Sequence, residues 1–164
     1  MLPQAFLERM QGLLGSEYEE FLTSFDHEKY QALRLNPLKL QEESGRTNDS
    51  AVIEEKIQQT FHLQPVLWAK NGYYYTKEDQ PGKHPWHEAG LYYIQEPSAM
   101  APVTLLSPQP GEQILDLCAA PGGKSTQIAS AMGGEGILVT NEIHPARAKI
   151  LSENHGDSEC LRIK

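Results

Sequence analysis

The chain begins with apolar residues at helical spacing. They recur every three or four positions, as in one face of a helix, and they are Phe6, Leu7, Met10, Leu13 and Leu14. Gly15-Ser16 interrupts this pattern, which resumes between Glu17 and Phe25. We therefore expect residues 2–24 to be helical, within an N-terminal helical segment that spans residues 1–30.

The next segment changes to a strand pattern. Residues 32–36 alternate apolar and polar side chains and stop at Pro37, which predicts a strand. A polar stretch at 42–49 predicts a loop, and an apolar period over 51–61 predicts a helix.

Asn71-Gly72 then separates two β-prone runs, 66–69 and 73–76. Asn-Gly between such runs is the strongest short signal of a hairpin. Residues 31–80 are thus expected to form a small αβ domain with the order strand, helix, hairpin.

The second half begins with a proline- and glycine-rich stretch at 78–85 and a helix predicted from Ser98 to Leu106. We interpret residues 81–112 as a linker and a helix that lead into the next domain. The pattern after it alternates strand and helix twice, over 114–118, 124–132, 136–140 and 145–154. A strand–helix–strand of this length predicts a right-handed crossover onto a parallel sheet, so the fold class is α/β.

Composition narrows the classes of protein. The chain of 164 residues has a net charge of −8 and a pI of about 5.2, which argues against wrapping nucleic acid by bulk charge. It has two cysteines, no signal peptide and no apolar run near the roughly 20 residues of a membrane span. We expect a cytoplasmic protein without a membrane partner.

The loop after the first of these strands carries the candidate chemistry. Its Gly-Gly-Lys-Ser-Thr ending resembles a P-loop, but that loop needs a glycine where Cys118 stands, and Pro121 lies inside it. The dinucleotide pattern of three spaced glycines is also absent. A nucleoside without phosphates fits better, because Glu142 follows the second strand about 20 residues on, where an acid binds ribose hydroxyls. S-adenosylmethionine is such a ligand, although an ordinary tight turn with a surface glutamate also fits the spacing.

At these residues the chain resembles the Nol/Nop/Sun group of RNA cytosine methyltransferases. The strings that carry the resemblance are Asp116-Leu-Cys-Ala-Ala-Pro-Gly-Gly-Lys124, Ala32-Leu-Arg-Leu-Asn-Pro-Leu-Lys39, His87-Glu-Ala-Gly-Leu-Tyr-Tyr-Ile-Gln-Glu-Pro-Ser-Ala-Met100 and Asn141-Glu142. The first is the cofactor motif of that family and is highly specific. The resemblance covers residues 1 to 154 and is greatest to bacterial members that modify small-subunit ribosomal RNA. It implies that 31–80 is RNA-binding-like and that 113–164 is the first half of a Rossmann-like methyltransferase domain.

The resemblance also implies roles for individual residues. Gly122 and Gly123 would allow close backbone approach, Lys124 would lie near the carboxylate of the cofactor, and Glu142 would hold its ribose. Asp116 would either support the loop or bind the cofactor through water. The residues expected to bind S-adenosylmethionine are therefore Cys118, Ala119, Ala120, Pro121, Gly122, Gly123, Lys124 and Glu142.

The resemblance does not extend to the catalytic residues. The family transfers a methyl group to carbon 5 of cytosine through a cysteine thiolate, in Pro-Cys and Thr-Cys motifs that this chain lacks. Cys118 belongs to the cofactor loop and Cys160 to a polar tail, so no residue is assigned as catalytic. We expect an N-terminal fragment of such an enzyme.

Other residues allow two interpretations each. His84 and His87 lack further ligands at metal spacing, so we expect loop histidines and no metal site. The runs Tyr73–Tyr75 and Tyr92–Tyr93 either stack on bases or pack in a core. Arg34 and Lys39 either contact phosphates or line a solvated strand edge.

Two rival functions stay open. One is a non-catalytic segment that binds RNA or a protein partner, which would not need to bind S-adenosylmethionine. The other is a P-loop nucleotide-binding protein, which would bind ATP with magnesium through Lys124.

We predict that this chain alone does not transfer methyl groups, because it lacks the cysteine motifs. The measurement is transfer of a radiolabelled methyl group from S-adenosylmethionine to ribosomal RNA, with a full-length family member as the positive control. Incorporation by the isolated chain above the protein-free blank would contradict the prediction.

Overall fold

The computed structural model describes residues 2–44 and 49–156, and the chain divides into two compact units at residue 30. The first unit holds α1 (Gln4–Leu14), the 3-10 turn η1 (Gly15–Glu17), α2 (Tyr18–Thr23) and the 3-10 turn η2 (Ser24–Asp26). Phe21 joins them, because its ring lies 6.2 Å from that of Phe6 and 5.1 Å, edge to face, from that of Phe25. The predicted helical start of the chain is confirmed.

The second unit, residues 31–164, contains two sheets. The larger sheet is antiparallel in the order β2-β3-β1-β4. Its strands are β1 (Gln31–Leu35), β2 (Gln64–Pro65), β3 (Gly72–Tyr75) and β4 (Tyr92–Ile94). The strand β4 comes from the segment that the sequence suggested as a linker, so this sheet extends across residue 80.

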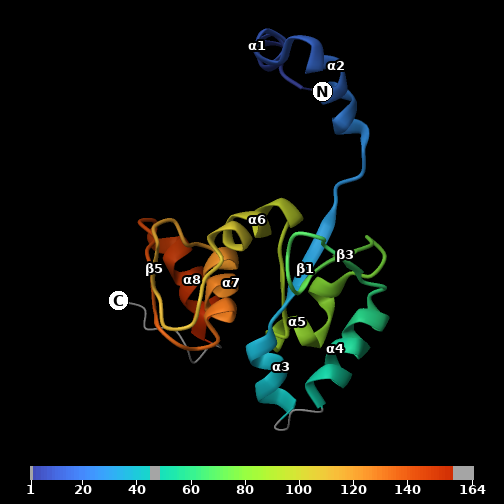
Figure 1. Cartoon of the computed structure of the whole chain (residues 1–164). Coiled ribbons are helices and arrows are strands. Elements are labelled where there is room, and N and C mark those ends of the chain that lie inside the picture. Colours follow the sequence, from blue (N-terminus) through green and yellow to red (C-terminus); the bar gives the residue numbers. More distant parts are fainter. Residues whose placement is uncertain (1, 45–48, 157–164) are drawn as a thin grey trace. The chain divides into compact units, whose positions relative to one another are not determined.

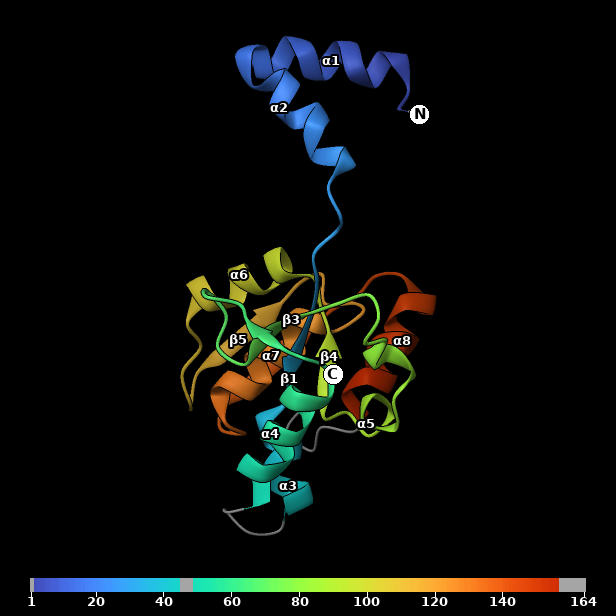
Figure 2. The ribbon, with the colours of Figure 1, turned by 90° about the vertical axis from the view of Figure 1, so that its right-hand side faces the viewer.

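The side chains of the central strand β1 alternate between the two faces of the larger sheet, and both faces are covered. Leu33 and Leu35 pack with Leu40 and Ile57, from the helices α3 (Pro37–Ser44) and α4 (Asp49–Thr60). These two helices lie side by side in both views (Figure 1, Figure 2). On the other face Ala32 packs with Met100 of α6 (Pro97–Leu106). The small 3-10 turn η3 (Pro81–Lys83) and α5 (Pro85–Glu88) precede β4.

Two local expectations for this sheet were wrong. The helix α3 includes residues 42–44, which the sequence predicted as loop, because Pro37 begins a helix after ending the strand. Of the rest of that expected loop, residues 45–48 lie outside the described residues and Asp49 begins α4. Residues 66–69 form turns, not a strand: Ala69 N donates to Val66 O and Gly72 N to Ala69 O. Val66 and Ala69 are apolar because they pack with Met100.

The smaller sheet has the expected parallel crossover. The strands β5 (Gln113–Asp116) and β6 (Ile137–Thr140) pair in parallel, joined through α7 (Gly123–Met132), and α8 (Pro145–Gly156) follows. Figure 1 shows β5 and these two helices together in the yellow-to-red part of the chain. The core between this sheet, α6 and α7 consists of Val103, Ile114, Ile128, Ala129, Met132 and Leu138.

The apolar run at 114–118 is typical of a buried strand, but β5 is covered on one face only. Leu115 is 57% exposed, and Ile137, which shares its face of the sheet, is 51% exposed. Ile114 on the opposite face packs against the core formed by α6 and α7. Among the described residues, no helix has both the length and the apolar content needed to cross a bilayer.

We predict that Leu115→Thr reduces aggregation without destabilising the fold, because it replaces an exposed apolar side chain by a polar β-branched one. The neighbouring Ile114→Thr is the matched control and should lower the free energy of unfolding by about 1–3 kcal/mol, because it places a hydroxyl against the core. Light scattering and urea denaturation measure the two effects. Equal destabilisation by both substitutions would contradict the assignment of faces.

Candidate cofactor site

The candidate site lies where β5 and β6 end. Asp116, the last residue of β5, accepts hydrogen bonds from Ser125 Oγ (2.7 Å) and from Cys118 N (3.3 Å). Ser125 is fully buried in the first turn of α7. The carboxylate therefore ties the loop to the start of the helix, which is the supporting role expected for Asp116.

The end of β6 is joined to the same loop. Asn141 N donates to Asp116 O (2.8 Å), and Ala119 N donates to Asn141 O (3.0 Å). The side-chain amide of Asn141 donates to Leu117 O (3.0 Å). These bonds hold the two strand ends together, as expected for adjacent parallel strands whose carboxyl ends form a ligand site.

Glu142 reaches the loop through an arginine. Its Oε1 accepts from His144 N (2.9 Å), and its Oε2 lies 3.4 Å from Arg147 Nη1. Arg147 Nη2 donates to Ala120 O (2.7 Å). The Glu142 side chain is only 5% exposed, so its orientation is fixed while it keeps acceptor capacity for hydroxyl donors.

The two glycines of the loop have different reasons to be glycine. Gly122 has φ +119°, a conformation that side chains rarely adopt. A Cβ on Gly123 would lie 3.1 Å from Tyr93 Cε1, so this glycine allows close packing against β4. The sequence attributed both glycines to close approach of a ligand, whereas Gly123 also makes room for a neighbouring strand.

The remaining residues of the predicted set differ in exposure. Cys118, Pro121 and Lys124 are exposed, and Cys118 is a free cysteine. Ala119 and Ala120 are buried with Leu151 of α8. No side chain among the described residues caps α7, so its first N–H groups face the loop and suit a carboxylate. Cys160 lies outside the described residues.

Arg34 is a part of this region that sequence reasoning misplaced. It is 2% exposed, so the solvated strand edge, one of the two interpretations that the sequence allowed, was wrong for this residue. Its Nη2 donates to Thr126 Oγ1 (2.7 Å) and to Gly123 O (3.3 Å), and its Nε donates to Gln95 Oε1 (3.2 Å). The guanidinium thus joins β1 to the first turn of α7. Nothing in the local pattern indicates this, because α7 lies far along the chain.

Burial affects the titration of this group and its neighbour. Desolvation lowers the pKa of Arg34 to about 10, partly offset by Tyr93, so the guanidinium stays charged at neutral pH. Burial in turn raises the pKa of Tyr93, and the nearby Arg34 charge opposes that increase.

Other side chains singled out in the sequence have structural contacts. Tyr92 packs in the same core as Leu33 and Ile57, and its hydroxyl donates to Pro81 O (2.8 Å). His84 Nδ1 accepts from Trp86 N at the start of α5. Lys39 lies in α3. The described residues contain no group of three or more histidine, cysteine, aspartate or glutamate side chains placed to hold a metal ion.

Comparison with known proteins gives two family matches. Residues 2–97 match the N-terminal domain of 16S rRNA methyltransferase RsmF, and residues 103–163 match 16S rRNA methyltransferase RsmB/F. Relatives named ribosomal RNA small subunit methyltransferase F from Erwinia tasmaniensis and Vibrio campbellii are each 36% identical over 160 residues. These alignments cover 93% of this chain, which spans about a third (32%) of the relatives' length.

Solved structures show the same fold. A methyltransferase homolog from Pyrococcus horikoshii matches with a TM-score of 0.78 and 26% identity, over 99% of this chain and 52% of its own. NSun6 from the same organism, solved with SFG, has a TM-score of 0.78 at 14% identity, over 99% of this chain and 65% of its own. The predicted α/β architecture is confirmed.

We predict that Thr126→Val lowers the free energy of unfolding by about 1.5–3 kcal/mol, because it removes the acceptor of a buried, charge-assisted hydrogen bond from Arg34. Thr104→Val is the matched control: Thr104 is exposed and bonds only the backbone of its own helix, so we expect about 0.5 kcal/mol or less. Urea denaturation measures both. Equal effects would show that the bond to Arg34 contributes little.

Proposed function

The chain belongs to the family of 16S rRNA methyltransferase RsmF, and on that premise we propose that it binds S-adenosylmethionine for methylation of small-subunit ribosomal RNA at carbon 5 of cytosine. Because the chain spans about a third of its relatives, the activity is proposed for the whole protein, and binding of the methyl donor for this chain. When bound, the cofactor supplies an electrophilic methyl group.

The observation that carries the proposal is the link from Glu142 through Arg147 to Ala120 O. It connects the acid after β6 to the loop after β5, which are the two places a nucleoside ligand must contact at once. We assign the ribose hydroxyls to Glu142, because its carboxylate is an acceptor held in place by Arg147 and His144 N.

The loop is assigned to the amino-acid end of the cofactor. The uncapped start of α7 presents N–H groups to a carboxylate, and Lys124 at that turn adds a positive charge. Gly122 allows the chain to turn into α7 at a positive φ, since it carries no side chain. Cys118 takes part as a wall of this site and is not assigned as a nucleophile.

The P-loop alternative is less well supported by the geometry. A phosphate cradle needs several consecutive N–H groups turned toward one ligand. In this loop two N–H groups already have partners: Ala119 N donates to Asn141 O, and Cys118 N donates to Asp116. Ala119 and Ala120 are also buried against Leu151 of α8.

We predict that the chain binds S-adenosylmethionine and that Glu142→Ala weakens binding at least about tenfold, equivalent to about 1.4 kcal/mol, by removing the ribose acceptor. Isothermal titration calorimetry measures the affinity. The control is Glu135→Ala, which removes the same charge from an exposed residue of the preceding loop and should leave affinity unchanged.

A thermal melt of each variant shows whether the fold is retained. Unchanged affinity in folded Glu142→Ala would contradict the ribose assignment. Absence of binding by the unsubstituted chain would favour the non-catalytic RNA- or partner-binding alternative.

A further inference from the structure

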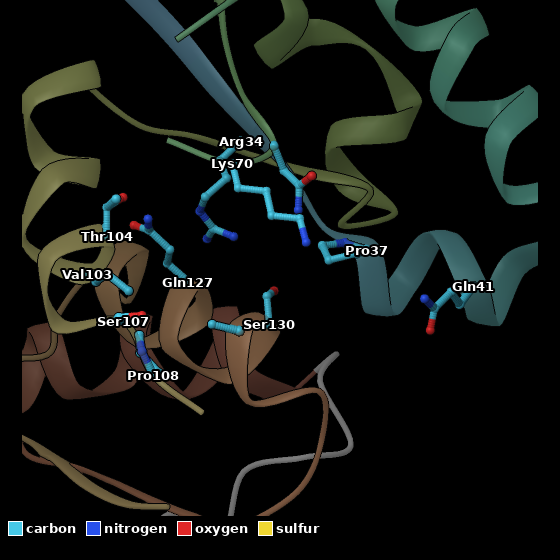
Figure 3. A pocket seen from close by; sticks show the side chains of 12 residues that line it. Arg34, Pro37, Gln41, Lys70, Val103, Thr104, Ser107, Pro108, Gln127 and Ser130 are labelled. Carbon is cyan, nitrogen blue, oxygen red and sulfur yellow. The ribbon is translucent and has the colours of Figure 1, made fainter. Parts of the chain in front are cut away.

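A cavity of about 470 Å³ lies apart from the candidate cofactor site. None of the eight residues assigned to the cofactor lines it; its walls come from β1, α3, α6, α7 and the turn before β3 (Figure 3). Its volume is within the range of ordinary ligand pockets. Because Lys70, Thr104 and Ser107 on its rim are exposed, the cavity is open to solvent.

The charge of the lining is opposite to that of the chain. The sequence has 22 acidic and 14 basic residues, yet the lining contains Arg34 and Lys70 and no carboxylate. Figure 3 shows both of these side chains pointing into the space between the helices. Two cations in a partly desolvated concavity concentrate a positive potential there, which attracts anions.

Arg34 is a buried charge with no oppositely charged partner among the described residues. Buried charges in proteins are normally paired with an opposite charge, since desolvation is costly. The partners of Arg34 among the described residues are an amide, a carbonyl and a hydroxyl, and none is a carboxylate. These bonds use Nε and Nη2, which leaves Nη1 without a hydrogen-bond partner in the described part of the chain. A buried guanidinium beside a cavity that lacks its counter-charge is suited to an anionic ligand.

We propose that this cavity binds one phosphate group of a single-stranded RNA, with Lys70 at the mouth and Arg34 at the floor. The inference rests on the proposed function, in which the substrate is RNA. Ser130 and Ser107 line the cavity with hydroxyl donors for phosphate oxygens. Pro37, Val103 and Pro108 supply apolar surface against which a ribose can pack. An open cavity suits a polymer, which must enter and leave along its length.

The test measures binding of a fluorescently labelled single-stranded oligoribonucleotide of about ten nucleotides to the whole chain, by anisotropy at several salt concentrations. Lys70→Ala should weaken binding about threefold to tenfold and reduce the slope of log K against log salt by about 0.7, the value for one lost contact to single-stranded phosphate. The matched control is Lys77→Ala, an exposed lysine outside the lining, which should change neither.

A second variant tests the cavity itself without touching Arg34, whose replacement is expected to disturb folding. Ser130→Asp places a carboxylate in the wall, where it competes with the phosphate, and should weaken RNA binding by at least the same factor. Thr60→Asp adds the same charge at an exposed position on the last turn of α4 and should have little effect.

Each outcome decides the inference. If Lys70→Ala binds RNA as well as the control Lys77→Ala, the cavity is not the phosphate site, while the proposed function stands. If inorganic phosphate binds with dependence on Lys70 but RNA does not, the cavity serves a small phosphate compound and the RNA assignment is overturned. If the chain does not bind RNA, the inference is also overturned, and calorimetry with S-adenosylmethionine still tests the proposed function separately.

Discussion

The buried guanidinium of Arg34 is the interaction on which the arrangement of the second unit depends. It starts on the central strand of the antiparallel sheet and ends on the first turn of α7, bonded to Gly123 O and Thr126 Oγ1. The candidate cofactor loop, residues 118–124, ends at that same turn. A charged group held at 2% exposure needs all of its partners in place, so the position of this turn is coupled to β1. The close approach of Gly123 to Tyr93 has the same consequence, because it leaves no space between the helix start and β4.

The candidate site itself is built from short polar links between strand ends. Asp116 holds the start of α7 through Ser125, and Arg147 holds Glu142 against the loop at Ala120 O. Both carboxylates are therefore oriented by hydrogen bonds before any ligand binds. Such pre-orientation lowers the entropy that ligand binding must overcome. Arg34 also lines the cavity behind the turn, and none of the eight residues assigned to the cofactor does.

Much of the fold followed from local patterns. The first helices, β1, α4, α6 and the crossover from β5 to β6 were predicted because each has its own period, cap or breaker within a few residues. The errors occurred where one pattern had two physical causes. The run at 66–69 is apolar because Val66 and Ala69 pack under Met100, and not because it pairs as a strand. Leu115 and Leu117 are apolar but exposed, and a hydrophobic run alone does not say which neighbour covers which face.

The sequence by itself determined the family and the two places that the cofactor is expected to contact, because the loop 118–124 and Glu142 are each defined by short local strings at a fixed separation. The tertiary structure alone decided how these places are joined and what Arg34 does. Arg147 meets Ala120 O across 27 positions of sequence, and Arg34 meets Thr126 across 92. Contacts of this kind depend on how helices pack on two sheets, and a hydrogen bond between distant residues leaves no period or spacing in the chain that could reveal it.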